Sequence, residues 1–210
     1  MKLLKQTIIQ LFSYSFILFF SNCNNYKTVI EGTLPNDTYD SETVFWIPME
    51  GEHLQPVDST SITKNTFRLV ISNHNLNKMG IVRVKPHLRF GLQDILVFTE
   101  AGTVKVKLDS ISSSSGTPLN DIMQKWKERK RVCDMEVYAL TSVIFQTETT
   151  DINAIEEDIK KIFAAYYEDV YRIIDENKNN GVGKFIYSIH RLFLKPEQIE
   201  ALGITEDVMK

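Results

Sequence analysis

The sequence predicts an α+β protein, with an N-terminal antiparallel β-sandwich followed by a small C-terminal helical bundle. Apolar and polar residues alternate at period 2 through the first half of the chain, whereas apolar residues recur at helical spacing in the second half. The change falls at the serine-rich stretch 112–116, which is typical of a flexible boundary. We therefore expect a sandwich domain over 28–111 and a helical region over 117–210.

Seven short strands are expected in the first half, each bounded by turn-forming residues. They span 28–34, 43–48, 56–62, 66–71, 80–85, 95–99 and 103–108. A sheet with one apolar face must bury that face, so this number of short strands predicts two packed sheets.

Three apolar stripes at helical spacing predict three helices in the second half, over 119–144, 152–173 and 182–193. A last short helix is expected to begin at Pro196, which suits a first turn, and to end at Gly203, which suits a carboxyl cap. Short connections between these helices favour a small bundle packed on or beside the sandwich.

The first residues predict export and lipid anchoring. Lys2 and Lys5 precede an apolar run over 8–20, which at 13 residues is shorter than the roughly 17 to 25 that span a membrane as a helix. The run ends in Phe20-Ser21-Asn22-Cys23, which resembles the lipobox of bacterial lipoproteins. We expect 1–22 to be a signal peptide, Cys23 to be the lipidated residue and 23–27 to be a tether. The alternative is an uncleaved or differently cleaved segment.

The charge and cysteine content exclude several classes. Removing 1–22 changes the formal charge from 24 − 27 to 22 − 27, or −5, which argues against a nucleic-acid partner. A basic run on a predicted helix is interpreted as a solvated face, with contact to anionic headgroups as the alternative. This run comprises Lys125, Lys127, Arg129, Lys130 and Arg131. Cys133 has no second cysteine to pair with once Cys23 is acylated, and we expect it to pack as a small apolar residue.

Several short motifs, in order along most of the chain, resemble a known family. They are Glu31-Gly32-Thr33-Leu34, Pro56-Val57-Asp58-Ser59-Thr60 with Phe67, Thr99-Glu100-Ala101-Gly102 and Ser115-Gly116-Thr117-Pro118-Leu119-Asn120-Asp121. They are similar to landmarks of domain of unknown function 4369, which typically precedes thioredoxin-like disulfide reductases in Gram-negative envelopes. Segments 180–183 and 194–198 are similar to the helices that join the two domains. The resemblance implies envelope location and architecture. Because no Cys-x-x-Cys follows, it does not imply reductase activity.

No catalytic, metal or cofactor site is predicted. The four histidines are scattered, and neither Asp58-Ser59 nor Asp109-Ser110 is framed as a nucleophile. We expect a non-catalytic binding or protein-interaction module, anchored in the outer membrane and facing the periplasm. The alternative is a small-ligand-binding or hydrolytic envelope enzyme with an unrecognised site. A deep pocket would favour that alternative, and an exposed apolar patch would favour a protein partner.

The predicted partner contact lies at the carboxyl end. Its apolar candidates are Ile199, Leu202, Ile204, Val208 and Met209. The partner would be a second copy of the chain or an envelope redox protein. The alternative is that these residues pack on the chain's own bundle.

Overall fold

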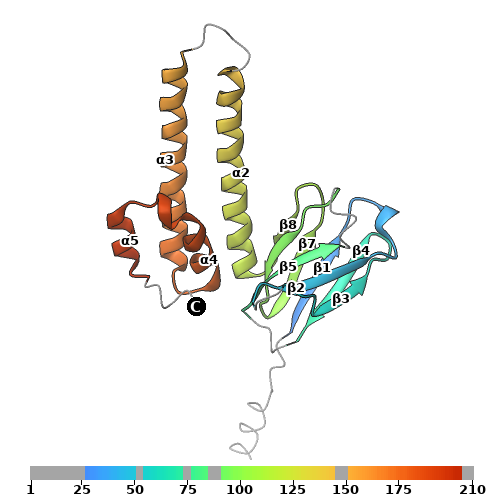
Figure 1. The fold of residues 1–210 in the computed structure, drawn as a ribbon. Coiled ribbons are helices and arrows are strands. Elements are labelled where there is room, and N and C mark those ends of the chain that lie inside the picture. Colours follow the sequence, from blue (N-terminus) through green and yellow to red (C-terminus); the bar gives the residue numbers. More distant parts are fainter. Residues whose placement is uncertain (1–26, 51–53, 73–76, 85–90, 145–150, 205–210) are drawn as a thin grey trace, which may run out of the picture.

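The structure, a computed structural model, describes residues 27–50, 54–72, 77–84, 91–144 and 151–204. Two sheets in the N-terminal half and helices in the C-terminal half confirm the predicted α+β class (Figure 1). The strands are β1 (Thr28–Thr33), β2 (Thr43–Pro48), β3 (Asp58–Ser61), β4 (Thr66–Ile71), β5 (Met79–Val84), β6 (Ile95–Phe98), β7 (Gly102–Lys107) and β8 (Ser113–Ser115). The helices are η1 (Asp37–Tyr39), α2 (Pro118–Ile144), α3 (Ile152–Asn177), α4 (Gly181–His190), η4 (Arg191–Phe193) and α5 (Pro196–Leu202).

The strands form two four-stranded sheets, with order β4-β1-β7-β8 in sheet A and β3-β2-β5-β6 in sheet B. The period-2 pattern turns alternate residues inward, and Ile30 and Val104 of sheet A join the same buried core as Trp46 of sheet B. One pair departs from the predicted antiparallel arrangement, because β1 and β7 run parallel.

The serine-rich stretch 112–116 is not the flexible boundary that its composition indicated. Ser113–Ser115 form β8, which pairs with β7 and extends the sandwich past the expected end at 111. Ser112 is buried, and its hydroxyl donates to the Gln93 carbonyl at 2.6 Å. The Ser112 hydroxyl satisfies backbone groups beside a paired strand, so the sandwich runs into α2 without a flexible linker.

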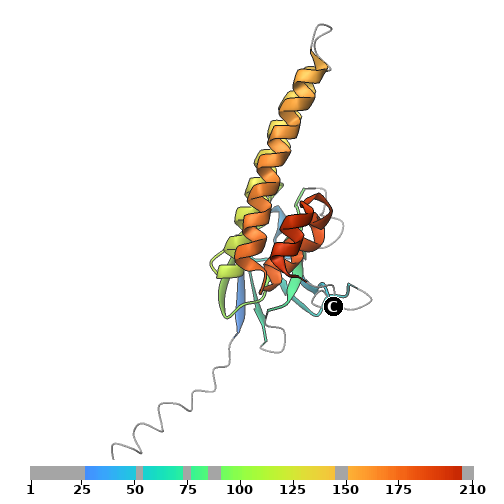
Figure 2. The ribbon, with the colours of Figure 1, turned by 90° about the vertical axis from the view of Figure 1, so that its left-hand side faces the viewer.

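The two long helices, α2 and α3, lie side by side and project well beyond the sandwich (Figures 1 and 2). With 27 and 26 residues, each is about 40 Å long at 1.5 Å per residue. A helical core lies at their base, where Met123, Ile174 and Ile186 are fully buried. Farther out, no described residue of 134–144 and 151–165 is buried. We call these two segments the arm. The expected bundle therefore exists only at the base.

The short helices α4 and α5 complete the base, and their ends follow local signals. The Asn180 side chain caps α4 by accepting from the amides of Val182 and Gly183. Pro196 lies in the first turn of α5, and Gly203 ends it with φ of 62°. Both predictions for this helix are confirmed.

The basic run on α2 is more than a solvated face. Lys127 Nζ donates to the Ser112 carbonyl at 3.0 Å, which ties the helix to the sandwich. Arg129 Nε donates to Asp169 Oδ2 at 2.6 Å, which ties α2 to α3. Burial lowers the pKa of the Lys127 ammonium, and the hydrogen bond to Asp169 raises the pKa of Arg129. A sequence pattern alone cannot show that these charges have partners on other elements.

Candidate functional site

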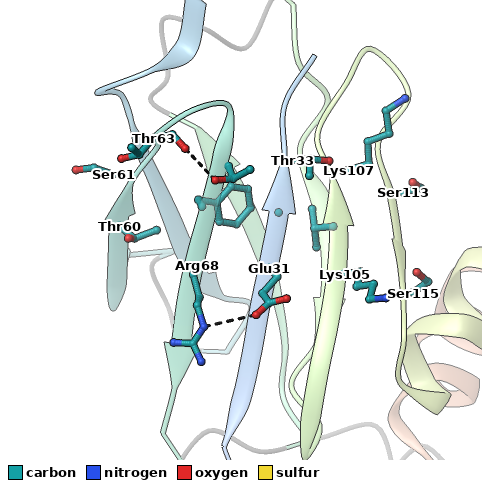
Figure 3. Close-up of a pocket in the computed structure, with 14 residues that line it drawn as sticks. Glu31, Thr33, Thr60, Ser61, Thr63, Arg68, Lys105, Lys107, Ser113 and Ser115 are labelled. Carbon is teal, nitrogen blue, oxygen red and sulfur yellow. Dashed lines mark hydrogen bonds and ion pairs between the residues drawn. The ribbon is translucent and has the colours of Figure 1, made fainter. Parts of the chain in front are cut away.

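An open groove of about 740 Å³ covers the outer face of sheet A (Figure 3). In each strand of this sheet, the residues between the buried ones point outward. Strand β3 and the turn after it add Thr60, Ser61 and Thr63 to the border. The groove is therefore built by regular strands, which fix the spacing of the backbone positions that carry its side chains.

Strand register aligns the outward side chains in two rows across the sheet. The first row reads Arg68, Glu31, Lys105 and Ser115 from β4 to β8. The second row reads Thr66, Thr33, Lys107 and Ser113. Neighbours within a row are about 4.8 Å apart, and the rows are about 7 Å apart. The groove thus presents a compact grid of cations and hydroxyls.

The floor of the groove depends on a glycine. The Phe67 ring packs across Gly32, and a Cβ at that position would lie 2.0 Å from two ring atoms. Only glycine allows this contact, in which an aromatic ring from the neighbouring strand covers the bare backbone. The floor is consequently a filled, rigid surface.

Three cations and one carboxylate line the groove, for a local charge of 3 − 1, or +2, in a chain of net charge −3. Arg68 Nε lies 3.6 Å from Glu31 Oε1, and Lys107 Nζ lies 3.0 Å from Asp109 Oδ2. A backbone hydrogen bond from Ser110 and the Lys107 ammonium hold the pKa of the Asp109 carboxyl below its ordinary value. Lys105 makes no ion pair with any described residue.

A second polar cluster joins the sandwich to α2. The Glu100 carboxylate accepts from the Thr117 hydroxyl at 2.6 Å and from the Leu119 amide at 2.9 Å, at the positive end of the helix dipole. The Asn120 side chain accepts from the Phe98 amide at 3.0 Å and donates to the Phe98 carbonyl at 2.8 Å. We call Glu100, Thr117 and Asn120 the joint.

Each joint residue belongs to one of the short motifs singled out in the sequence. Residues 28–123 match the model of a family described as Domain of unknown function (DUF4369). The resemblance stated from those motifs is confirmed for this segment. No curated protein and no solved structure shows a significant match to the chain. The DUF4369 segment ends inside α2, so it contains the whole joint together with both sheets.

The structure places three of the predicted partner-contact residues at the base of the helices. Leu202 is buried in the helical core, and Ile199 and Ile204 are half-buried against it. This placement agrees with the alternative in which they pack on the chain's own bundle. Val208, Met209 and Cys23 lie outside the described residues.

Exposed apolar side chains lie instead on α4 and η4. Leu192 is 85% exposed, Phe193 is 57% exposed, and Ile189 is also exposed. The Phe193 ring stacks on Tyr167 at 5.2 Å between centroids, and Tyr167 stacks on Phe163 at 6.1 Å. We call these five residues the aromatic step. The helical spacing of apolar residues in the sequence did not show which of these residues would be exposed and which would be buried.

The titratable groups of the helical core are buried and packed. Burial raises the pKa of the Cys133 thiol, so the nucleophilic thiolate is disfavoured. The Tyr166 hydroxyl lies 3.2 Å from His190 Nε2, and burial raises the pKa of Tyr166 to about 12 and lowers that of His190. Both side chains are enclosed by aromatic neighbours, which favours a structural role.

Other sequence candidates have local explanations. The carboxylates of Asp58 and Asp109 accept from the amides of Ser59 and Ser110, at 2.8 Å in each case.

Within the described ranges, no three histidine, cysteine or acidic side chains gather as metal ligands would. None of the described helices combines the length and apolar character needed to cross a membrane. His53, His74 and His87 lie outside the described residues.

The groove was not predicted from the sequence. Its signal is the alternation of outward polar residues on four separate strands, such as Lys105-x-Lys107 and Ser113-x-Ser115. Each pair alone is ordinary for a solvated strand face. Only the register of β1 with β4 and β7 brings the pairs into rows, and register over such separations is not readable from one sequence.

Proposed function

We propose that the protein is a lipid-anchored, non-catalytic binding module of the Gram-negative cell envelope, held in the outer membrane through Cys23 and facing the periplasm. The observation that carries the binding role is the groove on sheet A, a grid of three cations, one carboxylate and seven hydroxyl-bearing residues. It is open rather than deep, and its polar groups lie in rows rather than converging on one point. This arrangement suits holding a ligand more than transforming it.

The proposed anchor would hold the sandwich close to the membrane. From Cys23 to Thr28 the chain can reach at most about 18 Å, at about 3.6 Å per residue. The chain enters β1 at the end of the molecule away from the tip of the arm (Figure 1). An anchored molecule would therefore present the arm toward the periplasm.

Anchoring is tested by labelled palmitate and by fractionation of cells. We expect wild-type protein to incorporate the label, and Cys23→Ser to lose both label and membrane attachment. A Cys23→Ser protein that stayed fully membrane-bound would contradict the proposed anchor.

Groove binding is tested by thermal shift of the full chain against peptides, neutral sugars, anionic sugars and nucleotides. We expect saturable stabilisation by one class, abolished in Thr33→Trp, which places a bulky side chain in the groove. Turnover of any ligand, or insulin reduction that disappears in Cys133→Ser, would overturn the non-catalytic role.

A second candidate function, contact with a partner protein, is favoured by the aromatic step. Exposed apolar side chains grouped in this way mark interaction surfaces. We expect Leu192→Glu to remove a species that is crosslinked in intact cells, while Leu54→Glu, at an exposed leucine of the sandwich, leaves it unchanged. The mass of the crosslinked species separates a second copy from an envelope redox protein. An unchanged pattern in Leu192→Glu would exclude this surface.

A further inference from the structure

We propose that the groove on sheet A binds a sugar chain that carries carboxylate or phosphate groups. This inference rests on the proposed binding function and names the ligand class. Its basis is the pairing of an unneutralised cation with hydroxyls on one rigid face.

The anion-binding end of the groove is formed by β7 and β8. Lys105 and Lys107 are successive outward residues of β7, and the register places Ser115 opposite Lys105 and Ser113 opposite Lys107. Figure 3 shows the Lys105 side chain reaching toward Ser115, whereas Lys107 points away from it, so a ligand anion here would meet the Lys105 ammonium group and the Ser115 hydroxyl. Lys107 already contacts Asp109, whereas Lys105 has no charged partner among the described residues, so Lys105 supplies most of the uncompensated attraction.

The rest of the groove matches a polyhydroxyl ligand. Half of its fourteen lining residues carry a hydroxyl, which both donates and accepts hydrogen bonds as a sugar hydroxyl does. At the β4 edge, the Arg68 and Glu31 pair offers donors beside an acceptor, and both side chains are largely exposed. Adjacent hydroxyls of one sugar ring would bridge such a pair.

The sparse apolar surface explains why the ligand should be charged. Neutral sugars gain much of their affinity by stacking on exposed aromatic rings. Phe67 is the aromatic residue lining the groove, and it is only 5% exposed because it lies under the floor at Gly32. Attraction must therefore come from charge, chiefly that of Lys105, because Lys107 and Arg68 already have acidic partners.

The shape of the groove indicates an extended ligand. Four strands at about 4.8 Å spacing give a path of about 14 Å from Arg68 to Ser115, longer than a single sugar ring. A free anion would occupy only the β7 and β8 end. A chain of several sugars would engage both ends at once.

The test is calorimetric titration of the full chain in non-ionic detergent. The probes are hexagalacturonate, a phosphorylated mannose oligomer, uncharged maltohexaose, polyglutamate of matched charge and inorganic phosphate. We expect one of the two anionic sugars to bind at least about tenfold more tightly than maltohexaose, polyglutamate and phosphate, and more weakly as salt is raised. The identity of the anionic sugar that binds shows whether the ligand is a carboxylated or a phosphorylated sugar chain.

Two matched variants assign the binding to the groove. Lys105→Glu should weaken the favoured sugar by about tenfold or more. Lys125→Glu makes the same charge change at an exposed lysine of α2 and should leave the affinity unchanged. Ser115→Ala removes one hydroxyl without changing charge and should cause a smaller loss, about twofold to tenfold.

Three results would overturn the inference: polyglutamate binding as tightly as the sugars, maltohexaose binding equally well, or equal affinity in wild type and Lys105→Glu. If a peptide or neutral sugar bound instead and Thr33→Trp abolished that binding, the proposed binding function would stand and only the ligand class would fail. If no probe and no ligand class bound, both would fail.

Discussion

The base and the arm are parts of the same two helices, yet their surroundings differ. At the base, α2 contacts the sandwich through the joint and through Lys127, and it contacts α3 and α4 through a buried core. In the arm, α2 and α3 lie side by side, and no described residue is buried. Both parts carry the same helical periodicity. An apolar stripe therefore indicates that a helix forms. How much each residue of the stripe contributes to stability depends on how many other elements pack around the helix at that point.

Two isoleucines of α3, one at the base and one in the arm, test whether the two regions differ in stability. This pair gives the largest expected difference in the free energy of unfolding. Ile174 at the base is fully buried, and Ile159 in the arm is half-buried. We expect Ile174→Ala to lower the free energy of unfolding by about 2–5 kcal/mol, because it leaves a cavity in a packed core. Ile159→Ala should cost about 1 kcal/mol or less, since the site can collapse or admit water. Urea denaturation measures both, and equal losses would remove the distinction between base and arm.

Substitution of Asn120 tests the joint, with a smaller expected effect on the free energy of unfolding. Asn120 is fully buried and satisfies both backbone groups of Phe98. We expect Asn120→Ala to cost about 1–3 kcal/mol, because those groups would be left buried without partners. Asn153→Ala, at an exposed asparagine in the first turn of α3, should stay within about 0.5 kcal/mol of wild type. An Asn120→Ala protein as stable as this control would show that the Asn120 hydrogen bonds do not contribute to holding the two halves together.

The smallest expected effect is a pH dependence of the free energy of unfolding, which arises from a histidine in the core at the base of the long helices. Burial lowers the pKa of His190 below its ordinary value of 6.5, with the Lys130 charge as a second cause. Below pH 6.5 the unfolded chain binds a proton at this residue that the folded chain does not yet bind, so the free energy of unfolding falls as the pH falls through that range. Above pH 6.5 this contribution is fully present.

Denaturation at pH 7.5 and at pH 5.5 measures this dependence. We expect His190→Gln to reduce the difference between the two values, since glutamine does not titrate. An identical pH difference in wild type and variant would assign the dependence to other groups.

Much of the fold was predictable from the sequence, and the features that were not predicted have physical causes. The seven expected strands agree with β1 to β7 within two residues at each end, because half-buried strands carry a period-2 signal. Strand β8 was missed because its three residues are all serine, and pairing with β7 alone makes them a strand. The groove was missed because strand register creates its rows. The exposure of Leu192 and the burial of Leu202 depend on how α4 and α5 dock, which helical spacing does not encode.

The parallel pair in sheet A also sets an order for folding. Strand β1 comes first along the described part of the chain, yet it lies between β4 and β7, and residue 28 pairs with residue 102. Closing so long a loop is entropically costly and makes folding slow relative to folds built from local contacts. The topology itself thus delays completion of sheet A, because β1 can pair with β4 but lacks its second neighbour until 102–107 are available.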